Sequence, residues 1–425
     1  MPQQFQAPRG TSDVLPEDQK YWRYIQAKAE ETAARFGYER IDTPMFEDAK
    51  LFVRGVGETT DIVEKETYTF EDRGGDMVTL RPEGTAPVCR AYLEHGMQNL
   101  PQPLRLYYIL PMFRYERPQA GRFRQFHQVG MEAIGDPGAS IDAEVIEFGW
   151  RLLRALGLND IALVLNSIGD PNCRPAYLRR LKEYYQGRVG EMVHQDCKRR
   201  LERNPLRLLD CKQEACRPLI AGAPNSIDNL CAECAAHWEK LKTHLAAIGI
   251  SYTIDNRLVR GLDYYTRTVF EFIPPVAGSQ STILAGGRYD GLIQELGGKP
   301  TPGIGFGMGI ERIILNLKRV GALSEVKPQT KVLVAHMGEA AMQAAMPIAS
   351  GLRDSGITAV LGPAGRSLKS QLRYAQSIGA THAAILGDEE LAKGVVVLKD
   401  LSLGEQREVE PSGVASALEA AKQAV

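Results

Sequence analysis

Four arginines gather in a polar segment between two runs of strand-forming residues. The segment MFRYERPQAGRFRQFHQ occupies residues 112–128, with Arg114 at the end of the first run, Arg117 and Arg122 in the loop, and Arg124 just beyond it. A guanidinium offers planar, paired donors that match the oxygens of a phosphate. The segment therefore predicts a polyphosphate-binding hairpin. The alternative is a solvated charged hairpin, because runs of surface charge commonly hold no ligand.

The returning strand adds polar residues at alternate positions. Gln128, Gly130 and Glu132 share one face of the sheet, because side chains alternate along a strand. An amide and a carboxylate on an inner face are costly to bury without partners. A ligand with an ammonium or imidazole group would supply such partners. An exposed sheet face, where polar residues cost nothing, is the alternative.

A glycine-rich strand leads into a helix in GIGFGMGIERIIL, residues 303–315. Its glycines alternate, so one face of the strand carries no side chains and could receive a flat group. Arg312 follows in the first turn of the helix, where an anion is favoured. The pattern predicts a nucleotide with its base on the glycine strand and its phosphates near Arg312. It is neither a P-loop nor a dinucleotide fingerprint, because it lacks G-K-[ST] and G-x-G-x-x-G.

Three signals occur in order: a helix and strand ending at Pro44, the hairpin with Arg114, and the glycine strand with Arg312. Together they resemble motifs 1, 2 and 3 of the class II aminoacyl-tRNA synthetases. RGLDYYTRTVFEF (260–272) and AGGRYDGL (285–292) resemble the histidine-specific signatures of the histidyl-tRNA synthetase family. RGTSDVLPED (9–18) and TLRPEGTAP (79–87) fit the same family, so the resemblance covers essentially the whole chain.

The resemblance implies a histidine pocket formed by Glu83, Thr85, Gln128, Glu132, Tyr264 and Tyr265. Glu83 and Thr85 would contact the ammonium group, and the two tyrosines would close on the imidazole. A carboxylate fits an ammonium, and a tyrosine hydroxyl can recognise a ring nitrogen. Neighbouring strand residues face opposite ways, so the tyrosines can line one pocket only if the chain bends there, unless one of them has a supporting role.

The resemblance also implies an ATP site formed by Arg114, Arg122 and Arg312, accompanied by Mg²⁺. Arg114 would hold the α-phosphate and Arg312 the γ-phosphate. Arg260 resembles the catalytic arginine of the family, placed across the α-phosphate from Arg114. Two guanidiniums there would stabilise the charge that builds on phosphorus as a carboxylate attacks it.

The expected activity is that of a histidine–tRNA ligase, which activates L-histidine with ATP and transfers it to the 3′ end of tRNA(His). The rival is the catalytically silent, histidine-sensing regulatory subunit of ATP phosphoribosyltransferase, which has the same catalytic-domain fold. That relative typically lacks the carboxy-terminal domain, and its ATP arginines erode, whereas Arg114, Arg260 and Arg312 all stand here. An RNA-binding or kinase-regulatory module, and a synthetase for another amino acid, are further alternatives.

The expected architecture has two domains. Strands joined by hairpins and interleaved with helices predict an α+β catalytic domain with an antiparallel sheet over residues 1–325. Residues 172–245 read as an inserted helical subdomain, in which 174–217 carry twelve Lys/Arg against six Asp/Glu. After a linker near Lys327, residues 328–425 alternate strands and helices, which predicts an α/β domain with a mixed or parallel sheet. This part resembles the anticodon-binding domain of related synthetases.

Seven cysteines are present, and their chemistry is open. Cys211, Cys216, Cys231 and Cys234, with His237 nearby, have the spacing of a four-thiolate zinc site. Family members need no zinc for catalysis, so reduced thiols without a metal are the default expectation. Disulfides are unexpected in a reducing compartment.

Composition sets the remaining expectations. Apolar residues make up 44% and charged residues 24%, with a net charge of −1, so any RNA contact would need a local basic surface. No stretch approaches the roughly 18–20 apolar residues of a membrane helix, and the start MPQQFQAPRG is not a signal peptide. We expect a cytoplasmic homodimer without a membrane partner, since motif 1 usually forms a two-fold interface.

Overall fold

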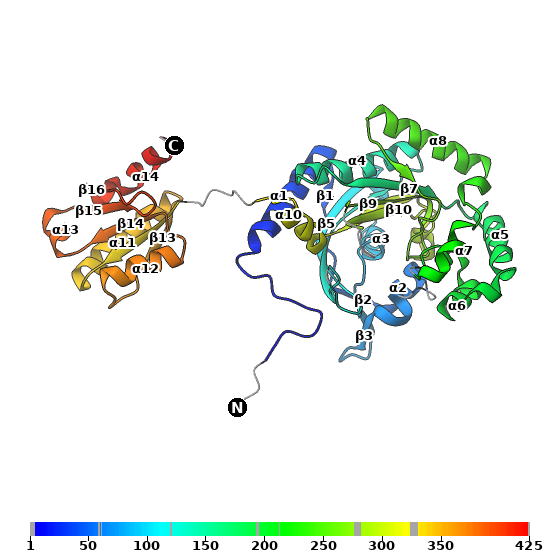
Figure 1. Cartoon of the computed structure of the whole chain (residues 1–425), viewed down its shortest axis with the longest axis horizontal. Helices are drawn as coiled ribbons and strands as arrows, with labels where there is room; N and C mark the ends of the chain where they lie inside the picture. The colour runs from blue at the N-terminus through cyan, green and yellow to red at the C-terminus, as the bar shows by residue number, and fades with distance from the viewer. Residues whose placement is uncertain are drawn as a thin grey trace. The chain divides into compact units, whose positions relative to one another are not determined.

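Two compact units, Met1–Leu323 and Ser324–Val425, make up the chain (Figure 1). The computed structural model describes residues 5–57, 60, 62–119, 121–192, 195–211, 213–275, 282–323 and 330–423. The linker expected near Lys327 lies outside these residues. None of the helices within the described ranges is both long enough and apolar enough to cross a membrane.

An eight-stranded sheet forms the centre of the first unit. Its order is β1 (Glu39–Arg40), β5 (Leu104–Phe113), β6 (Gln125–Ile134), β11 (Gly303–Gly309), β10 (Leu284–Arg288), β9 (Thr266–Ile273), β7 (Ala162–Ser167) and β8 (Thr253–Ile254). The six central strands pair antiparallel, which confirms the predicted sheet. Only the short edge strands β1 and β8 pair parallel with their neighbours.

Helices cover both faces of this sheet, and the alternation along β6 assigns the faces. Val129, Met131 and Ala133 belong to one hydrophobic core with α1 (Gln19–Phe36), α4 (Ala139–Ala155), α8 (Ala232–Ala247) and α10 (Ile310–Arg319). The second core holds β5 residues with α2 (Ala49–Val56), α3 (Thr85–Glu94) and α9 (Leu292–Glu295). Figure 1 shows α4 and α8 on one side of the sheet and α2 on the other. The polar residues at the alternate positions of β6, Gln128 and Glu132, therefore lie on the face of the sheet that α3 covers.

The insertion after β7 is helical, as predicted, but it is smaller than residues 172–245. Its helices α5 (Arg174–Gln186), α6 (Gln195–Arg203) and α7 (Arg217–Ala221) share a small core of their own. α8 instead joins the main core through Trp238, Leu241 and Leu245. These side chains recur at helical spacing on one face, and that face packs against α4. The boundary at 245 was therefore wrong, because α8 belongs to the catalytic layer.

A three-stranded sheet lies beside the main one. Its order is β2 (Phe46–Asp48), β4 (Met77–Leu80), β3 (Tyr68–Glu71). β3 and β4 form a hairpin whose turn contains Arg73, Gly74 and Gly75. Its outer face carries Phe46 and Phe70, which are 57% and 46% exposed, whereas Glu47 and Thr79 on the inner face are buried.

The second unit contains a five-stranded sheet, β13 (Thr358–Leu361), β12 (Lys331–His336), β14 (His382–Leu386), β15 (Val396–Asp400) and β16 (Gln406–Val409). β12 pairs parallel with both neighbours, as predicted, while β15 and β16 run antiparallel. One face packs against α11 (Glu339–Asp354) and α14 (Val414–Gln423), the other against α12 (Leu368–Ser377). The sheet is therefore mixed, between two helical layers.

A buried ion network joins α4, α8 and β10. Arg288 and Asp142 form an ion pair with both side chains fully buried, and Nε2 of His237 lies 2.8 Å from Oδ2 of Asp142. Arg288 also donates to the carbonyl oxygens of Gly138 and Asp136. Burial alone would raise the pKa of Asp142, but Arg288 and His237 hold it below its usual value. The negative charge of Asp142 is therefore compensated inside the core by its two neighbours.

We predict that Asp142→Asn destabilises the chain strongly, because Arg288 would lose its fully buried carboxylate partner and keep only the half-buried Asp290, 2.9 Å away. Removing one member of a buried pair costs about 3–5 kcal/mol. The measurement is the urea midpoint of the first unfolding transition. Glu31→Gln, which removes an exposed ion pair with Lys28, is the matched control and should leave the midpoint close to that of wild type. Equal midpoints for the two variants would contradict the structural importance of the network.

Candidate active site

One large cavity of about 780 Å³ lies on the α3 side of the main sheet. Its lining comes from the segment before α3, from the β5–β6 hairpin, from residues 257–265, and from β9, β11 and the start of α10. The insertion adds residues between Leu209 and Ala221. Pockets of this size hold a ligand as large as a nucleotide. All of the predicted substrate residues except Glu132 line it directly: Glu83, Thr85, Arg114, Arg122, Gln128, Arg260, Tyr264, Tyr265 and Arg312.

Two carboxylates form one end of the cavity. Glu83 caps α3, because its carboxylate accepts the backbone N–H of Thr85 at 2.7 Å and of Ala86 at 2.9 Å. The hydroxyl of Thr85 donates to Glu132 at 2.8 Å, so the two acids are linked through one residue. Glu132 lies just below the cavity lining and is completely buried. Its alternation with Gln128 and Gly130 on one strand face is as predicted.

Burial raises the pKa of both acids. It raises the pKa of Glu132 to about 8, although Thr85 donates a hydrogen bond to it. Burial also raises the pKa of Glu83, against the two backbone N–H groups that stabilise its ionised form. Within the part of the chain that the structure describes, neither acid forms an ion pair. A cationic ligand would supply the missing charge.

The first two glycines of the glycine strand make room for side chains of the protein, whereas the sequence predicted that the whole strand would receive a ligand. A side chain at Gly303 would collide with the ring of Tyr289, and one at Gly305 would collide with Glu132. These two glycines make room for protein side chains, so no ligand lies on them. Only Gly307 and Gly309 line the cavity. The predicted flat surface over the whole strand was wrong, because neighbouring strands already fill half of it.

Tyr264 and Tyr265 both line the cavity, which the bend expected at this point makes possible. They precede β9 in a turn, and their ring centroids are 4.6 Å apart. The hydroxyl of Tyr264 donates to Glu83 at 3.3 Å. Nη2 of Arg174 donates to the carbonyl oxygen of Tyr265 at 2.6 Å and so holds the turn from behind.

Arginines dominate the opposite end. Nη1 of Arg312 donates to the carbonyl oxygen of Thr282 at 2.6 Å, and Nε of Arg122 lies 2.8 Å from Glu116. Burial and the nearby Arg122 lower the pKa of Arg312, which reflects crowding of positive charge. Arg260 comes from the segment 257–265 and forms an ion pair with Glu271. The concentration of guanidiniums makes this end suited to a polyphosphate.

Arg117 and Arg124 are not among the lining residues, although the sequence grouped them with Arg114 and Arg122. Arg117 is exposed, and the guanidinium of Arg124 stacks on the ring of Tyr115 at 3.8 Å. The hairpin therefore divides its charges between the cavity and the outer surface. Only the tertiary structure could show this, because spacing alone does not tell which way a loop side chain points.

Three residues of the site were missed from the sequence: Tyr108, Tyr289 and Glu271. Tyr108 lies opposite Gly130 and donates to Glu132 at 3.3 Å. A side chain at Gly130 would collide with the ring of Tyr108, so a glycine facing an aromatic residue was the available signal. Glu271 is the penultimate residue of the 260–272 stretch, and its carboxylate accepts a hydrogen bond from the hydroxyl of Thr282 at 2.7 Å. No pattern in the sequence pointed to its role.

The four-cysteine zinc set predicted from spacing is not assembled. Cys211 and Cys216 gather with Cys197, whose Sγ lies 3.3 Å from that of Cys211. Cys231 and Cys234 gather in a separate group with Asp170 and Cys173. The first pair packs in the core of the insertion, whereas the second begins α8. His237 is engaged by Asp142 and joins neither group.

Comparison with known proteins assigns this arrangement to a family. The family model for histidyl-tRNA synthetase matches residues 10–313, and the model for an anticodon-binding domain matches residues 331–421. The chain belongs to the histidyl-tRNA synthetase family. It is 58% identical to the histidine–tRNA ligase of Dehalococcoides mccartyi strain 195, over 93% of this chain and 95% of the relative. With that of Desulforamulus reducens the identity is 49% over 95% and 96% of the two chains.

Solved structures agree with this assignment. The apo histidyl-tRNA synthetase of Staphylococcus aureus superposes with a TM-score of 0.82 at 38% identity, covering 97% of this chain and 99% of that one. A Bacillus halodurans protein described as an ATP phosphoribosyltransferase regulatory subunit/histidyl-tRNA synthetase gives 0.66 at 26% identity, covering 91% and 99%. The family match and the full-length ligase relatives favour the synthetase over the regulatory subunit.

We predict that Glu132→Gln stabilises the ligand-free protein, and more so at pH 8 than at pH 5. When the pKa of a carboxyl is higher in the folded protein than its unfolded value of about 4.3, the free energy of unfolding falls as the pH rises between the two pKa values. For Glu132 this interval extends to about pH 8. Each pKa unit corresponds to about 1.4 kcal/mol, so the gain at pH 8 is on the order of several kcal/mol.

Thermal unfolding midpoints of both proteins at pH 5 and pH 8 test this expectation. Glu239→Gln, on the exposed side of α8, is the control and should change neither midpoint. A gap between wild type and Glu132→Gln that does not grow with pH would mean that the buried carboxyl is not the source.

Proposed function

We propose that this cavity activates L-histidine with ATP, releasing pyrophosphate, and then transfers the histidyl group to the 3′ end of tRNA(His). The observation that carries the proposal is a single cavity with two buried acids at one end and a group of arginines at the other. An amino acid whose cationic groups meet the acids presents its carboxylate toward the arginines. The reacting atoms would then meet between the two ends.

The acid end would recognise histidine. Glu83 and Thr85 would receive the ammonium group, because both face the cavity and Glu83 is held rigidly by the start of α3. Gln128 and Glu132 would lie at the pocket floor, with Tyr264 and Tyr265 against the imidazole. A pocket whose polar groups are satisfied only by the right ligand rejects analogues that lack those groups, because the polar groups would remain unpaired.

The arginine end would bind ATP. Arg114 and Arg260 would flank the α-phosphate, Arg312 would hold the γ-phosphate, and Arg122 would join them. The histidine carboxylate attacks the α-phosphorus, a phosphorus–oxygen bond forms, and the bond to the β-phosphate breaks so that pyrophosphate leaves. The carboxylate is already ionised, so this step needs no general base. The guanidiniums stabilise the charge that develops on phosphorus.

Mg²⁺ would accompany the pyrophosphate portion of ATP. The ion would bind through substrate phosphates and one or two carboxylates, and Glu116 and Glu271 are the acids of the cavity lining that lie beside the arginines. When bound, Mg²⁺ neutralises phosphate charge. The residues of this chain orient the nucleotide around it, and the pairing of Glu271 with Arg260 keeps both groups in place before substrate arrives.

The second step would require tRNA contacts from both units. The acceptor end would approach near the basic insertion, and the Ser324–Val425 unit, which matches an anticodon-binding domain, would contact the anticodon. A single-stranded anticodon offers unstacked bases that a protein can read by shape and hydrogen bonding. The reaction belongs to translation, so the proposed location is the cytoplasm.

A homodimer is part of this proposal. Phe46 and Phe70 project from the outer face of the three-stranded sheet, where water would surround two large aromatic side chains. An exposed apolar surface of this kind marks a protein interface. A two-fold partner would bury the surface against its own copy.

We predict that Arg260→Ala loses histidine-dependent ATP–pyrophosphate exchange by about a hundredfold to a thousandfold, the usual effect of removing one transition-state donor. Exchange is measured without tRNA, with each amino acid in turn, so that activation is isolated. Arg151→Ala, which removes an exposed arginine of α4, should retain full exchange. Thermal unfolding of both variants separates lost chemistry from lost structure. Wild-type protein that exchanges with no amino acid would instead support the regulatory subunit.

We predict that Tyr264→Phe raises the KM for histidine by about tenfold, equivalent to about 1.4 kcal/mol, and leaves the KM for ATP unchanged. The hydroxyl is lost from the acid end, where it contacts Glu83, while the ring that packs on Tyr265 remains. Tyr184→Phe in α5 is the matched control, because that hydroxyl donates to a carbonyl inside the insertion. Equal effects on both KM values would remove Tyr264 from histidine recognition.

A further inference from the structure

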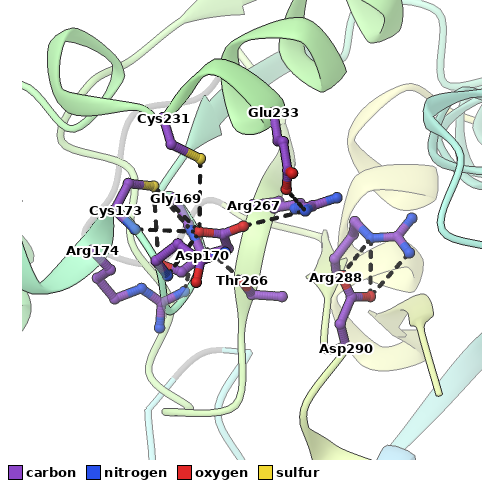
Figure 2. A network of polar contacts seen from close by, with 11 residues as sticks. Gly169, Asp170, Cys173, Arg174, Cys231, Glu233, Thr266, Arg267, Arg288 and Asp290 are labelled. Carbon is purple, nitrogen blue, oxygen red and sulfur yellow. Dashed lines mark hydrogen bonds and ion pairs between the residues drawn. The ribbon is translucent and has the colours of Figure 1, made fainter. Parts of the chain in front are cut away.

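Four potential metal ligands meet at the base of the insertion, outside the cavity. They are Asp170, Cys173, Cys231 and Cys234, called here the base cluster. One ligand atom from each lies within 4.8 Å of all the others. Figure 2 shows Cys173 and Cys231 converging on the carboxylate of Asp170. Three of the four side chains are buried, and only Cys231 is partly exposed.

The geometry of the base cluster fits a tetrahedral ion. Oδ1 of Asp170 lies 3.5 Å from Sγ of Cys173 and 4.0 Å from Sγ of Cys231. With zinc–sulfur bonds of about 2.3 Å and zinc–oxygen bonds of about 2.0 Å, a tetrahedron separates sulfur and oxygen by about 3.5 Å. These two separations are close to the tetrahedral value, and the remaining ligand atoms lie within 4.8 Å of one another.

The local backbone builds this arrangement from two short motifs. Asp170 and Cys173 follow β7 as D-x-x-C, in a turn where Gly169 has a φ of 70°. A side chain at Gly169 would lie 2.7 Å from Sγ of Cys173, so the position requires glycine. Cys231 and Cys234 form C-x-x-C at the start of α8, which brings both thiols to one side of the first turn. Paired ligands at this spacing are typical of structural zinc sites.

We propose that the base cluster binds one Zn²⁺ ion as a structural site. Three thiolates favour a soft or borderline ion over Mg²⁺ or Ca²⁺, which prefer oxygen ligands. Four protein ligands leave no open position for a substrate, so the site is structural. The second cysteine group differs in this respect, because the described residues supply only three ligands there: Cys197, Cys211 and Cys216.

The ion would clamp both ends of the insertion to each other. The chain enters α5 one residue after Cys173 and starts α8 one residue after Cys231, so the whole insertion is a loop closed at the base cluster. Within the base cluster itself, contacts of the Cys173 and Cys231 thiols with the Asp170 carboxylate link the two ends. A metal that binds only the folded arrangement adds its binding free energy to the stability of that arrangement.

The same cluster supports the turn behind the histidine pocket. Nη2 of Arg267 lies 3.2 Å from Oδ2 of Asp170 (Figure 2). The other carboxylate oxygen, Oδ1, faces the thiols and also accepts the backbone N–H of Asn172 at 3.0 Å and of Cys173 at 3.3 Å. The carbonyl oxygen of Gly169 accepts from Thr266 at 3.1 Å and from Arg174 at 3.0 Å. Arg174 in turn holds the carbonyl of Tyr265. Partners of metal ligands orient those ligands, so the ion and the turn would stabilise each other.

Metal content tests the proposal directly. Untagged, full-length protein is produced with added zinc, dialysed against metal-free buffer, and measured by elemental analysis. Cys234→Ser should contain one zinc ion per chain less than wild type. Asp170→Cys, which replaces the oxygen ligand with a fourth thiolate, should keep the ion. Cys89→Ala is the matched control, because Cys89 is buried in α3 and belongs to neither cysteine group.

The cobalt spectrum of the wild-type protein is a readout that does not depend on a variant that folds. Wild-type protein stripped of metal and supplied with Co²⁺ should show the visible bands of tetrahedral cobalt and a thiolate charge-transfer band. A chelator should lower the unfolding midpoint of wild type and leave that of Cys234→Ser unchanged. Zinc-free wild type that takes up no Co²⁺, equal zinc in wild type and Cys234→Ser, or a Cys231–Cys234 disulfide found by thiol titration would each overturn the proposal.

Discussion

The arrangement of the catalytic unit depends on two carboxylates that are buried without a cationic partner. Glu83 and Glu132 lie at the floor of the cavity, joined through Thr85, and burial raises the pKa of both. A protein of marginal stability keeps such groups only where function repays their cost. The elements around them reflect this constraint, since α3, β5 and β6 hold the acids rigidly while the cavity remains open above them.

Close packing on the sheet divides space between protein and ligand. Gly303, Gly305 and Gly130 are small so that Tyr289, Glu132 and Tyr108 can approach the backbone. Gly307 and Gly309, which follow Gly303 and Gly305 along β11, line the cavity instead. A single alternating pattern therefore serves two purposes, first the construction of the acid floor and then the accommodation of a substrate. The change occurs where β11 approaches α10 and Arg312.

The insertion is part of the site although it is a separate small core. Residues near Leu209 and Ile220 line the cavity, while the insertion's ends return to the sheet at the base cluster. Its position relative to the pocket is set at this junction and by the contacts of Asn204 with Asp263 and of Arg203 with Glu64. Arg174 spans this junction, because it begins α5 and reaches the carbonyl of Tyr265. Movement of the insertion would reach the proposed histidine pocket along this contact.

The sequence by itself determined the local and ordered features: the helix and strand periods, the antiparallel hairpins, the glycine strand with Arg312, and the family to which these motifs belong. Such features depend on neighbouring residues, whose spacing a sequence displays. Which arginines of the hairpin enter the cavity, which glycines are filled by protein, and which cysteines meet depended on contacts between distant segments. Cys231 and Cys234 are separated from Asp170 and Cys173 by the whole insertion, and α8 joins the main core instead of the insertion. Spacing along the chain carries no record of such meetings, because only folding brings the segments together.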